Sequence, residues 1–119
     1  RLLGLSTPEQ KAKVRIDAHD TYSLDFTLAR IIHPALVKFK DLNNGHPANM
    51  TSEQCEKILD KMIWSFDQLL RFSELEESVF KEFQRTQDFD AYKAAHAAHH
   101  KKIQDGLFLF AKHYQSLWW

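Results

Sequence analysis

Apolar and ring-bearing side chains recur every three or four residues along most of this chain of 119 residues. The pattern is longest between residues 89 and 117, where these positions are Phe89, Tyr92, His96, His99, Ile103, Phe110, Tyr114 and Leu117. Because residues three and four apart share one face of an α-helix, we predict one continuous helix over 89–117. Two of its histidines, His96 and His99, are then expected to face the rest of the protein.

A second helix is predicted from Ser23, with a wide apolar face formed by Leu24, Leu28, Ile31, Ile32, Ala35, Leu36 and Phe39. Pro34 lies inside this helix, where it removes a backbone donor and crowds the preceding turn. A kink or two consecutive helices is therefore expected there. Residues 43–47, Asn-Asn-Gly-His-Pro, are typical of a loop and are expected to follow the end of the helix.

A third helix is predicted to begin at Thr51, because Thr51 and Gln54 have the spacing of a capping box. Its apolar stripe consists of Ile58, Leu59, Met62, Ile63, Phe66, Leu69 and Leu70, and Trp64 falls on the flank of that stripe. Cys55, the only cysteine, lies on the same stripe in the first turn. We interpret it as a small buried hydrophobe rather than a nucleophile, and one cysteine excludes an internal disulfide.

Two weaker signals suggest shorter helices. Thr7-Pro8-Glu9 is a typical helix start and predicts a surface helix from about Pro8 to the Asp17–Asp20 region. Residues 73–77, Ser-Glu-Leu-Glu-Glu, either cap a short helix that carries Val79, Phe80 and Phe83 or form an acidic connector.

The terminal helix is expected to be capped by Asp88, and Gly106 inside it is expected where a neighbouring element packs closely. We find no alternation typical of strands and no internal repeat. The sequence therefore predicts an all-α fold: residues 1–119 form a single domain, an antiparallel bundle of three long helices plus one or two short ones.

Sixteen basic residues balance sixteen acidic ones, so no net field favours nucleic acid or an anionic membrane. The chain has no uninterrupted apolar run long enough for a membrane span and no recognisable leader, and it is therefore interpreted as cytosolic. Within this balance, residues 71–90 are acidic and the following stretch is mildly basic.

Three histidines near the middle of the terminal helix are the first candidate site. The spacing of His96, His99 and His100 places imidazoles one turn apart, where two of them can reach one divalent transition metal. A further ligand would have to come from Asp20, Asp25, His19, His33, Glu76 or Glu77. The alternative is a polar seam in which the rings bond to neighbouring backbone or side chains.

Carboxylates around the start of the second helix form a second candidate. Asp17, Asp20 and Asp25 flank Tyr22 and Ser23, and Asp25 lies at the rim of the apolar face. A carboxylate there is costly unless it is paired, so we expect a salt bridge to Arg30, to a lysine or to a histidine of the terminal helix. General acid or base chemistry is the other interpretation.

Aromatic residues at the end of the chain indicate a docked terminus. Trp118 and Trp119 either close the core or anchor another protein, since tryptophan and tyrosine dominate binding hot spots. Tyr114 and Trp64 are candidates for the same partner surface.

Three segments of the chain resemble a group of small uncharacterised proteins encoded by tailed bacteriophages. These are residues 20–25 (Asp-Thr-Tyr-Ser-Leu-Asp) running into 28–36, residues 58–66 with Leu-Asp-Lys-Met-Ile-Trp, and residues 103–112 with the Ser-Leu-Trp-Trp ending. The resemblance implies a phage accessory protein that acts inside the infected cell. It includes Asp20, Tyr22, Ser23 and Asp25, whereas the histidine cluster is not a mark of the group.

We therefore expect a non-catalytic module, without a cofactor, that binds a host or phage protein in the cytoplasm of the infected host cell. The alternative is a bundle that binds a metal or small ligand, or an enzyme, using inward histidine and aspartate side chains. A structural role in the virion is a third hypothesis. The composition also permits a homodimer.

Overall fold

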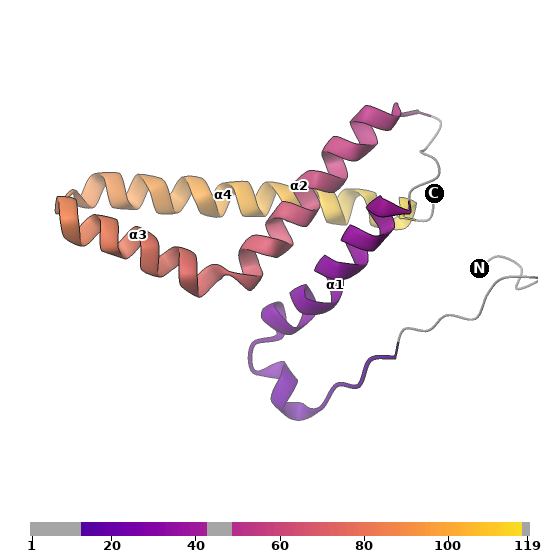
Figure 1. The fold of residues 1–119 in the computed structure, drawn as a ribbon, viewed down its shortest axis with the longest axis horizontal. Helices are drawn as coiled ribbons and strands as arrows, with labels where there is room; N and C mark the ends of the chain where they lie inside the picture. Colours follow the sequence, from indigo (N-terminus) through magenta and orange to yellow (C-terminus); the bar gives the residue numbers. More distant parts are fainter. Residues whose placement is uncertain (1–12, 43–48, 118–119) are drawn as a thin grey trace, which may run out of the picture.

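Four α-helices make up most of the chain in the computed structural model, which describes residues 13–42 and 49–117. They are α1 (Leu24–Asp41), α2 (Ser52–Leu70), α3 (Phe72–Thr86) and α4 (Phe89–His113), with short 3-10 helices at Ala18–Thr21 and Tyr114–Ser116 (Figure 1). The described residues contain no strand. The all-α fold and the helical bundle predicted from the sequence are confirmed.

The starts of α2 and α4 follow from local capping. At α2 the Thr51 hydroxyl accepts from the Gln54 backbone N–H at 3.1 Å, and the Gln54 side chain accepts from the Thr51 N–H at 2.9 Å. At α4 the Asp88 carboxylate accepts from the Ala91 N–H at 2.9 Å. These bonds satisfy backbone donors that have no partner within a helix, so both predicted starts are confirmed.

Helix α2 packs against both α1 and α4 (Figure 1). The Cα atoms of α1 and α4 nowhere approach within 8 Å of each other. The core is the cluster formed between these helices by Ala29, Leu36, Leu59, Met62 and Phe66. Each of these residues except Ala29 lies on a predicted apolar stripe. The helical spacing of apolar residues therefore predicted most of the core.

The approach of α2 to α4 depends on Gly106. A Cβ atom built on Gly106 would lie 1.8 Å from the Ser65 Oγ atom and 2.6 Å from the backbone oxygen of Lys61. Ser65 is itself fully buried, and its hydroxyl donates to the Ile103 carbonyl at 3.0 Å. The close packing expected at Gly106 is thus confirmed.

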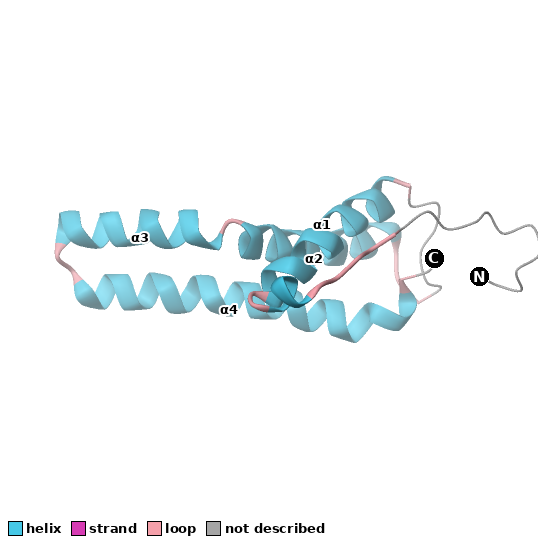
Figure 2. Cartoon of the chain, turned by 90° about the horizontal axis from the view of Figure 1, so that it is seen from below, coloured by secondary structure: helices cyan, strands magenta, loops and turns pink. Residues whose placement is uncertain are grey.

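Helix α3 and the first part of α4 run side by side as a hairpin that extends away from α1, as Figures 1 and 2 show. The described molecule is consequently 62 Å long and 20 Å thick, with a radius of gyration of 17.9 Å. A compact domain of about 100 residues would have a radius of gyration of about 13 Å. Of the two alternatives for residues 73–77, the helical one is right, although α3 already begins at Phe72.

Two predicted helix boundaries need correction. Residues 13–17 are not helical, and the first helical turn of the described residues is the 3-10 helix Ala18–Thr21, because Asp17 has an extended backbone and caps that turn through the His19 N–H. The terminal helix ends at His113 and continues as the 3-10 helix Tyr114–Ser116. Residues 8–12 and the loop predicted at 43–47 lie outside the described residues.

An ion pair between α1 and α2 provides a test of how these two helices pack together. The hydrogen bond from Lys40 to Asp60 raises the pKa of Lys40 above its ordinary value of 10.5 and outweighs the opposing effect of desolvation, and the charges of Asp60 and Glu56 raise the pKa further. Because the folded-state pKa is raised, the stabilisation is present below pH 10.5 and is lost as the pH rises through the folded value.

We expect Lys40→Met to lower the free energy of unfolding by less than about 1 kcal/mol at neutral pH, since the pair is partly exposed. The difference from the unsubstituted chain should shrink between about pH 8 and about pH 11.5 in urea denaturation. Lys57→Met, at an exposed position of α2, is the control. A Lys40→Met difference that stays constant over this range would contradict the assignment.

Candidate functional site

Two buried polar side chains of α2 face α4. Ser65 is fully buried and Gln68 is 6% exposed. The Gln68 Oε1 atom lies 2.9 Å from the His99 Nε2 atom. An amide oxygen can only accept a hydrogen bond, so Nε2 of His99 carries the proton in this contact and is not available as a metal ligand. His99 is half-buried, as its predicted inward orientation requires.

The three clustered histidines of α4 have three different neighbours. His99 contacts Gln68, whereas the Nε2 atom of His96 lies 3.3 Å from the Glu76 Oε1 atom on α3, with both side chains about half exposed. His100 lines a cavity next to α1. His96 thus faces α3, in the predicted direction, but its side chain stays about half exposed because α3 covers that side only partly. In the described part of the chain, no group of three or more His, Cys, Asp or Glu residues is placed to hold a metal ion.

The cavity beside His100 is the clearest meeting point of residues distant in the sequence. It has a volume of about 570 Å³ and is lined by Ser23, Asp25, Phe26, Leu69, Leu70, His100, Ile103, Gln104 and Leu107. It exists because α1 and α4 both pack on α2 while their backbones remain apart. The cavity combines an apolar floor with a few polar groups, which is the usual composition of a ligand site.

Asp25 and His100 approach this cavity from different helices, 75 positions apart in the sequence. No hydrogen bond or ion pair joins them, and Asp25 forms no ion pair with any residue that the structure describes. The predicted salt bridge of Asp25 is thus wrong, because the start of α1 is exposed and its carboxylate remains solvated. An anionic group above an apolar floor is suited to bind an apolar side chain or ligand that carries a cation.

The other two residues of the predicted polar site lie elsewhere. The Asp20 carboxylate accepts from the Asp17 N–H at 3.0 Å, and the Asp20 carbonyl accepts from the Thr27 hydroxyl at 2.9 Å. Tyr22 is 80% exposed, with the edge of His19 against its ring. Asp20 therefore stabilises the turn that leads into α1, and only Ser23 and Asp25 of this group reach the cavity.

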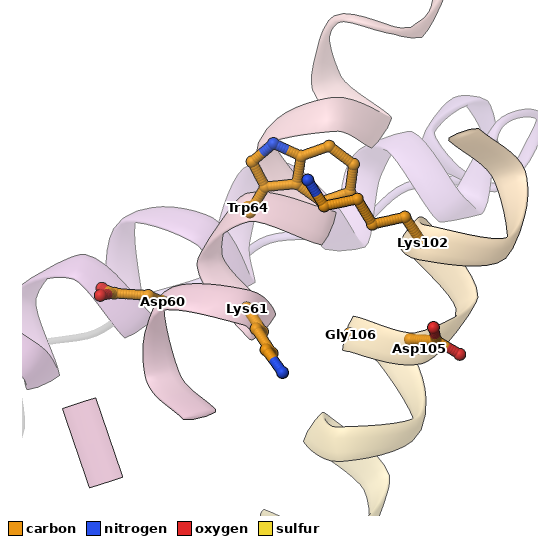
Figure 3. Close-up of a pocket in the computed structure, with 6 residues that line it drawn as sticks. All are labelled: Asp60, Lys61, Trp64, Lys102, Asp105 and Gly106. Atoms are coloured by element: carbon orange, nitrogen blue, oxygen red, sulfur yellow. The ribbon is translucent and has the colours of Figure 1, made fainter. Parts of the chain in front are cut away.

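A second cavity, of about 440 Å³, lies at the crossing of α2 and α4 (Figure 3). Trp64 forms one wall, and the Lys102 side chain extends across its ring with Nζ 4.2 Å from the ring centroid. His99 packs edge-on against the same indole. Trp64, predicted as a partner contact, is half-buried and already has a cation on its face.

The remaining candidate residues are a cysteine and the terminal aromatics. Cys55 is 1% exposed, and burial raises the pKa of its thiol, which disfavours the reactive thiolate and agrees with the interpretation as a hydrophobe. Tyr114 is 62% exposed, with its ring against Phe110. Trp118 and Trp119 lie outside the described residues.

Sequence reasoning did not identify Gln68 or Gln104 as part of these contacts. Gln68 had a usable signal, since it lies three residues after Ser65 on the apolar side of α2, and a polar pair on a buried face needs partners. Gln104 had no such signal because it lies on the exposed side of α4 and meets the cavity only through the placement of α1.

Comparison with protein-family models, with well-characterised proteins and with solved structures gave no match to this chain. The resemblance to phage proteins accordingly stays a prediction. Among residues 13–42 and 49–117, every helix is too short or too polar to cross a membrane.

Proposed function

We propose that this chain is a non-catalytic binding module that docks another protein on the outer face of α1. The outer face consists of Leu24, Leu28, Ile31 and Ala35, which follow one another at intervals of three or four residues. The three larger side chains are 44%, 43% and 36% exposed. This exposed stripe is the observation that carries the proposal.

Packing among the residues that the structure describes does not account for the outer face. The inner face of α1, with buried Ala29 and Leu36, already supplies the contact with α2. A surface helix of a globular protein needs an apolar stripe of only about 100°. Together the two faces of α1 cover about half of the helix circumference, so the outer one is suited to an apolar partner surface.

An amphipathic helix of the partner is the simplest complement. Exposed apolar residues at helical spacing are the usual anchors when one helix packs along another protein. The resemblance to tailed-phage proteins supports a host or phage protein as the partner, bound in the cytoplasm of the infected cell. Tyr114, Trp118 and Trp119 remain proposed as additional anchors of the same partner.

The test is capture of partners from bacterial lysates with the full chain and with Leu28→Glu. We expect a protein retained by the unsubstituted chain, and at least a tenfold higher Kd for Leu28→Glu once that protein is purified and titrated. Phe108→Glu is the matched control, because Phe108 is 68% exposed on α4, outside the outer face. Equal binding by all three chains would refute the outer face as the docking surface.

The alternative function, a small-ligand or metal-binding bundle, is supported by Asp25 and His100 in one cavity. A ligand that binds the folded state must raise its stability, so melting temperature with and without Zn²⁺, Mn²⁺ or Fe²⁺ tests the metal version. Under this alternative the shift should disappear in Asp25→Asn and in His100→Gln. If elemental analysis finds no bound metal and the melting temperature does not change, the metal-binding alternative is excluded.

A further inference from the structure

The hairpin of α3 and residues 89–102 of α4 is a two-helix element without a core of its own. None of its described side chains is buried, and the first buried residue along α4 is Ile103. Along most of this length each helix of the hairpin packs against the other, as Figure 2 shows, and α4 meets α2 at the inner end of the hairpin, where His99 and Lys102 contact Trp64. Two helices cannot enclose an apolar layer, so part of their inward surface stays open to solvent.

Aromatic rings line this open surface. Phe83 lies 5.2 Å from Tyr92 and 6.1 Å from Phe89, measured between ring centroids, and Phe80 packs 6.1 Å from Phe83. Phe80 and Phe89 are 47% and 57% exposed, whereas Phe83 and Tyr92 are half-buried beneath them. We call Phe80, Phe83, Phe89 and Tyr92 the aromatic face of the hairpin.

The two helices of the hairpin differ in charge. Helix α3 carries four glutamates against one lysine and one arginine, whereas residues 89–103 of α4 carry three lysines and three histidines against one aspartate. Only one ion pair, between Glu76 and His96, joins the two helices in the part that the structure describes. One hairpin thus presents an acidic helix and a basic helix side by side.

Such a surface is complementary to itself. When two hairpins stack about a two-fold axis parallel to their helices, α3 of each copy lies on α4 of the other. An acidic helix then faces a basic helix at both of these contacts. The aromatic rings then fill the centre of a four-helix bundle, in which the inward faces of all four helices are covered. We propose that this chain forms a homodimer through the aromatic face of the α3–α4 hairpin.

The size of the face sets the strength of the dimer. Fifteen residues of helix extend about 22 Å, and two adjacent helices are about 20 Å wide, so each copy contributes about 450 Å² of projected area. The two copies together bury about 900 Å², which is below the roughly 1,200–2,000 Å² of stable specific complexes and in the range of weak, transient ones. The dimer is therefore weak and depends on protein concentration.

The first experiment is sedimentation velocity of the full chain from about 1 μM to several hundred μM, the range in which a weak dimer dissociates. The unsubstituted chain should change from monomer to dimer across this range. Phe80→Glu and Phe89→Glu should each raise the dissociation constant at least tenfold while keeping the circular dichroism of the native fold. Phe108→Glu, exposed on α4 beyond the hairpin, should not change it.

The second experiment uses charge reversal to test which helices meet. A chain with Glu74→Lys and Glu77→Lys has two basic helices, and a chain with Lys93→Glu and Lys101→Glu has two acidic ones. Each alone should stay monomeric, and an equimolar mixture should form a heterodimer. The mixture is informative because both of its α3–α4 contacts pair opposite charges.

Three outcomes would overturn the proposal: a chain that is monomeric throughout, a dimer unaffected by Phe80→Glu and Phe89→Glu, or a charge-reversed mixture that fails to associate. A monomer whose hairpin instead binds lipid vesicles or a different protein belongs to the first outcome. The result is independent of the proposed function, since Leu28→Glu on α1 should leave this dimer intact.

Discussion

Replacing Gly106 by alanine is expected to lower the free energy of unfolding by about 2 kcal/mol or more, and the melting temperature by about 10 °C. The added methyl group would lie 1.8 Å from the Ser65 Oγ atom and 2.6 Å from the Lys61 carbonyl oxygen. The carbonyl belongs to the backbone of α2 and cannot rotate away. The two helices must therefore separate, which weakens the Ser65 to Ile103 hydrogen bond as well.

The expected loss of stability in Gly106→Ala is opposite to the intrinsic preference of a helix for alanine over glycine. Alanine favours a helix over glycine by about 1 kcal/mol, so at an exposed position such as Ala98 the reverse change, Ala98→Gly, should be destabilising. The double variant Gly106→Ala with Ser65→Gly should recover only part of the loss, because the contact with the Lys61 carbonyl remains. Thermal and urea denaturation measure the stability of Gly106→Ala, of Ala98→Gly and of the double variant. Unchanged stability in Gly106→Ala would mean that α2 and α4 do not cross this closely.

Truncation of Leu59 to alanine is expected to cost about 2–5 kcal/mol. Leu59 is fully buried in the cluster that joins α1, α2 and α4, and its neighbours belong to helices that cannot easily collapse into the space left behind. The loss has two parts, the transfer free energy of the removed methyl groups and the cavity that remains. A loss this large is a considerable share of the stability of a domain of this size.

Leu28→Ala is the matched comparison, since it removes the same atoms from a side chain that is 43% exposed on the outer face of α1. Its effect on the isolated chain should stay within about 0.5 kcal/mol. Urea denaturation of the two variants side by side measures the difference. Similar losses at positions 28 and 59 would show that the outer face of α1 is covered in solution.

Prediction from the sequence succeeded where the determining interactions are local. The capping box of Thr51 and Gln54 and the cap at Asp88 each depend on atoms within three residues, and both occur as predicted. It failed at residues 13–17, where the charged pattern resembled a surface helix but Asp17 directs its capping bonds to the following turn. A weak apolar pattern does not supply enough burial to override such a local bond.

The candidate site was predictable only in part. Asp25 and the histidines of α4 were identified as chemically interesting residues, yet the sequence did not indicate that His100 rather than His96 or His99 would share a cavity with Asp25. The three histidines lie within five positions, and a helix turns by about 100° per residue. A small difference in the rotation of α4 therefore decides which ring meets which neighbour.

What the sequence alone determined is the three long helices, the capped starts of α2 and α4 and the apolar face that each long helix presents, because backbone hydrogen bonds and side-chain spacing act over a few residues. Only the tertiary structure decided which faces were covered. It placed Gly106 against Ser65, separated α1 from α4, and left the outer face of α1 and the aromatic face of the hairpin exposed. The physical reason is that pairing between distant helices depends on the total area that they bury, and similar apolar stripes on four helices permit several pairings that the local pattern cannot distinguish.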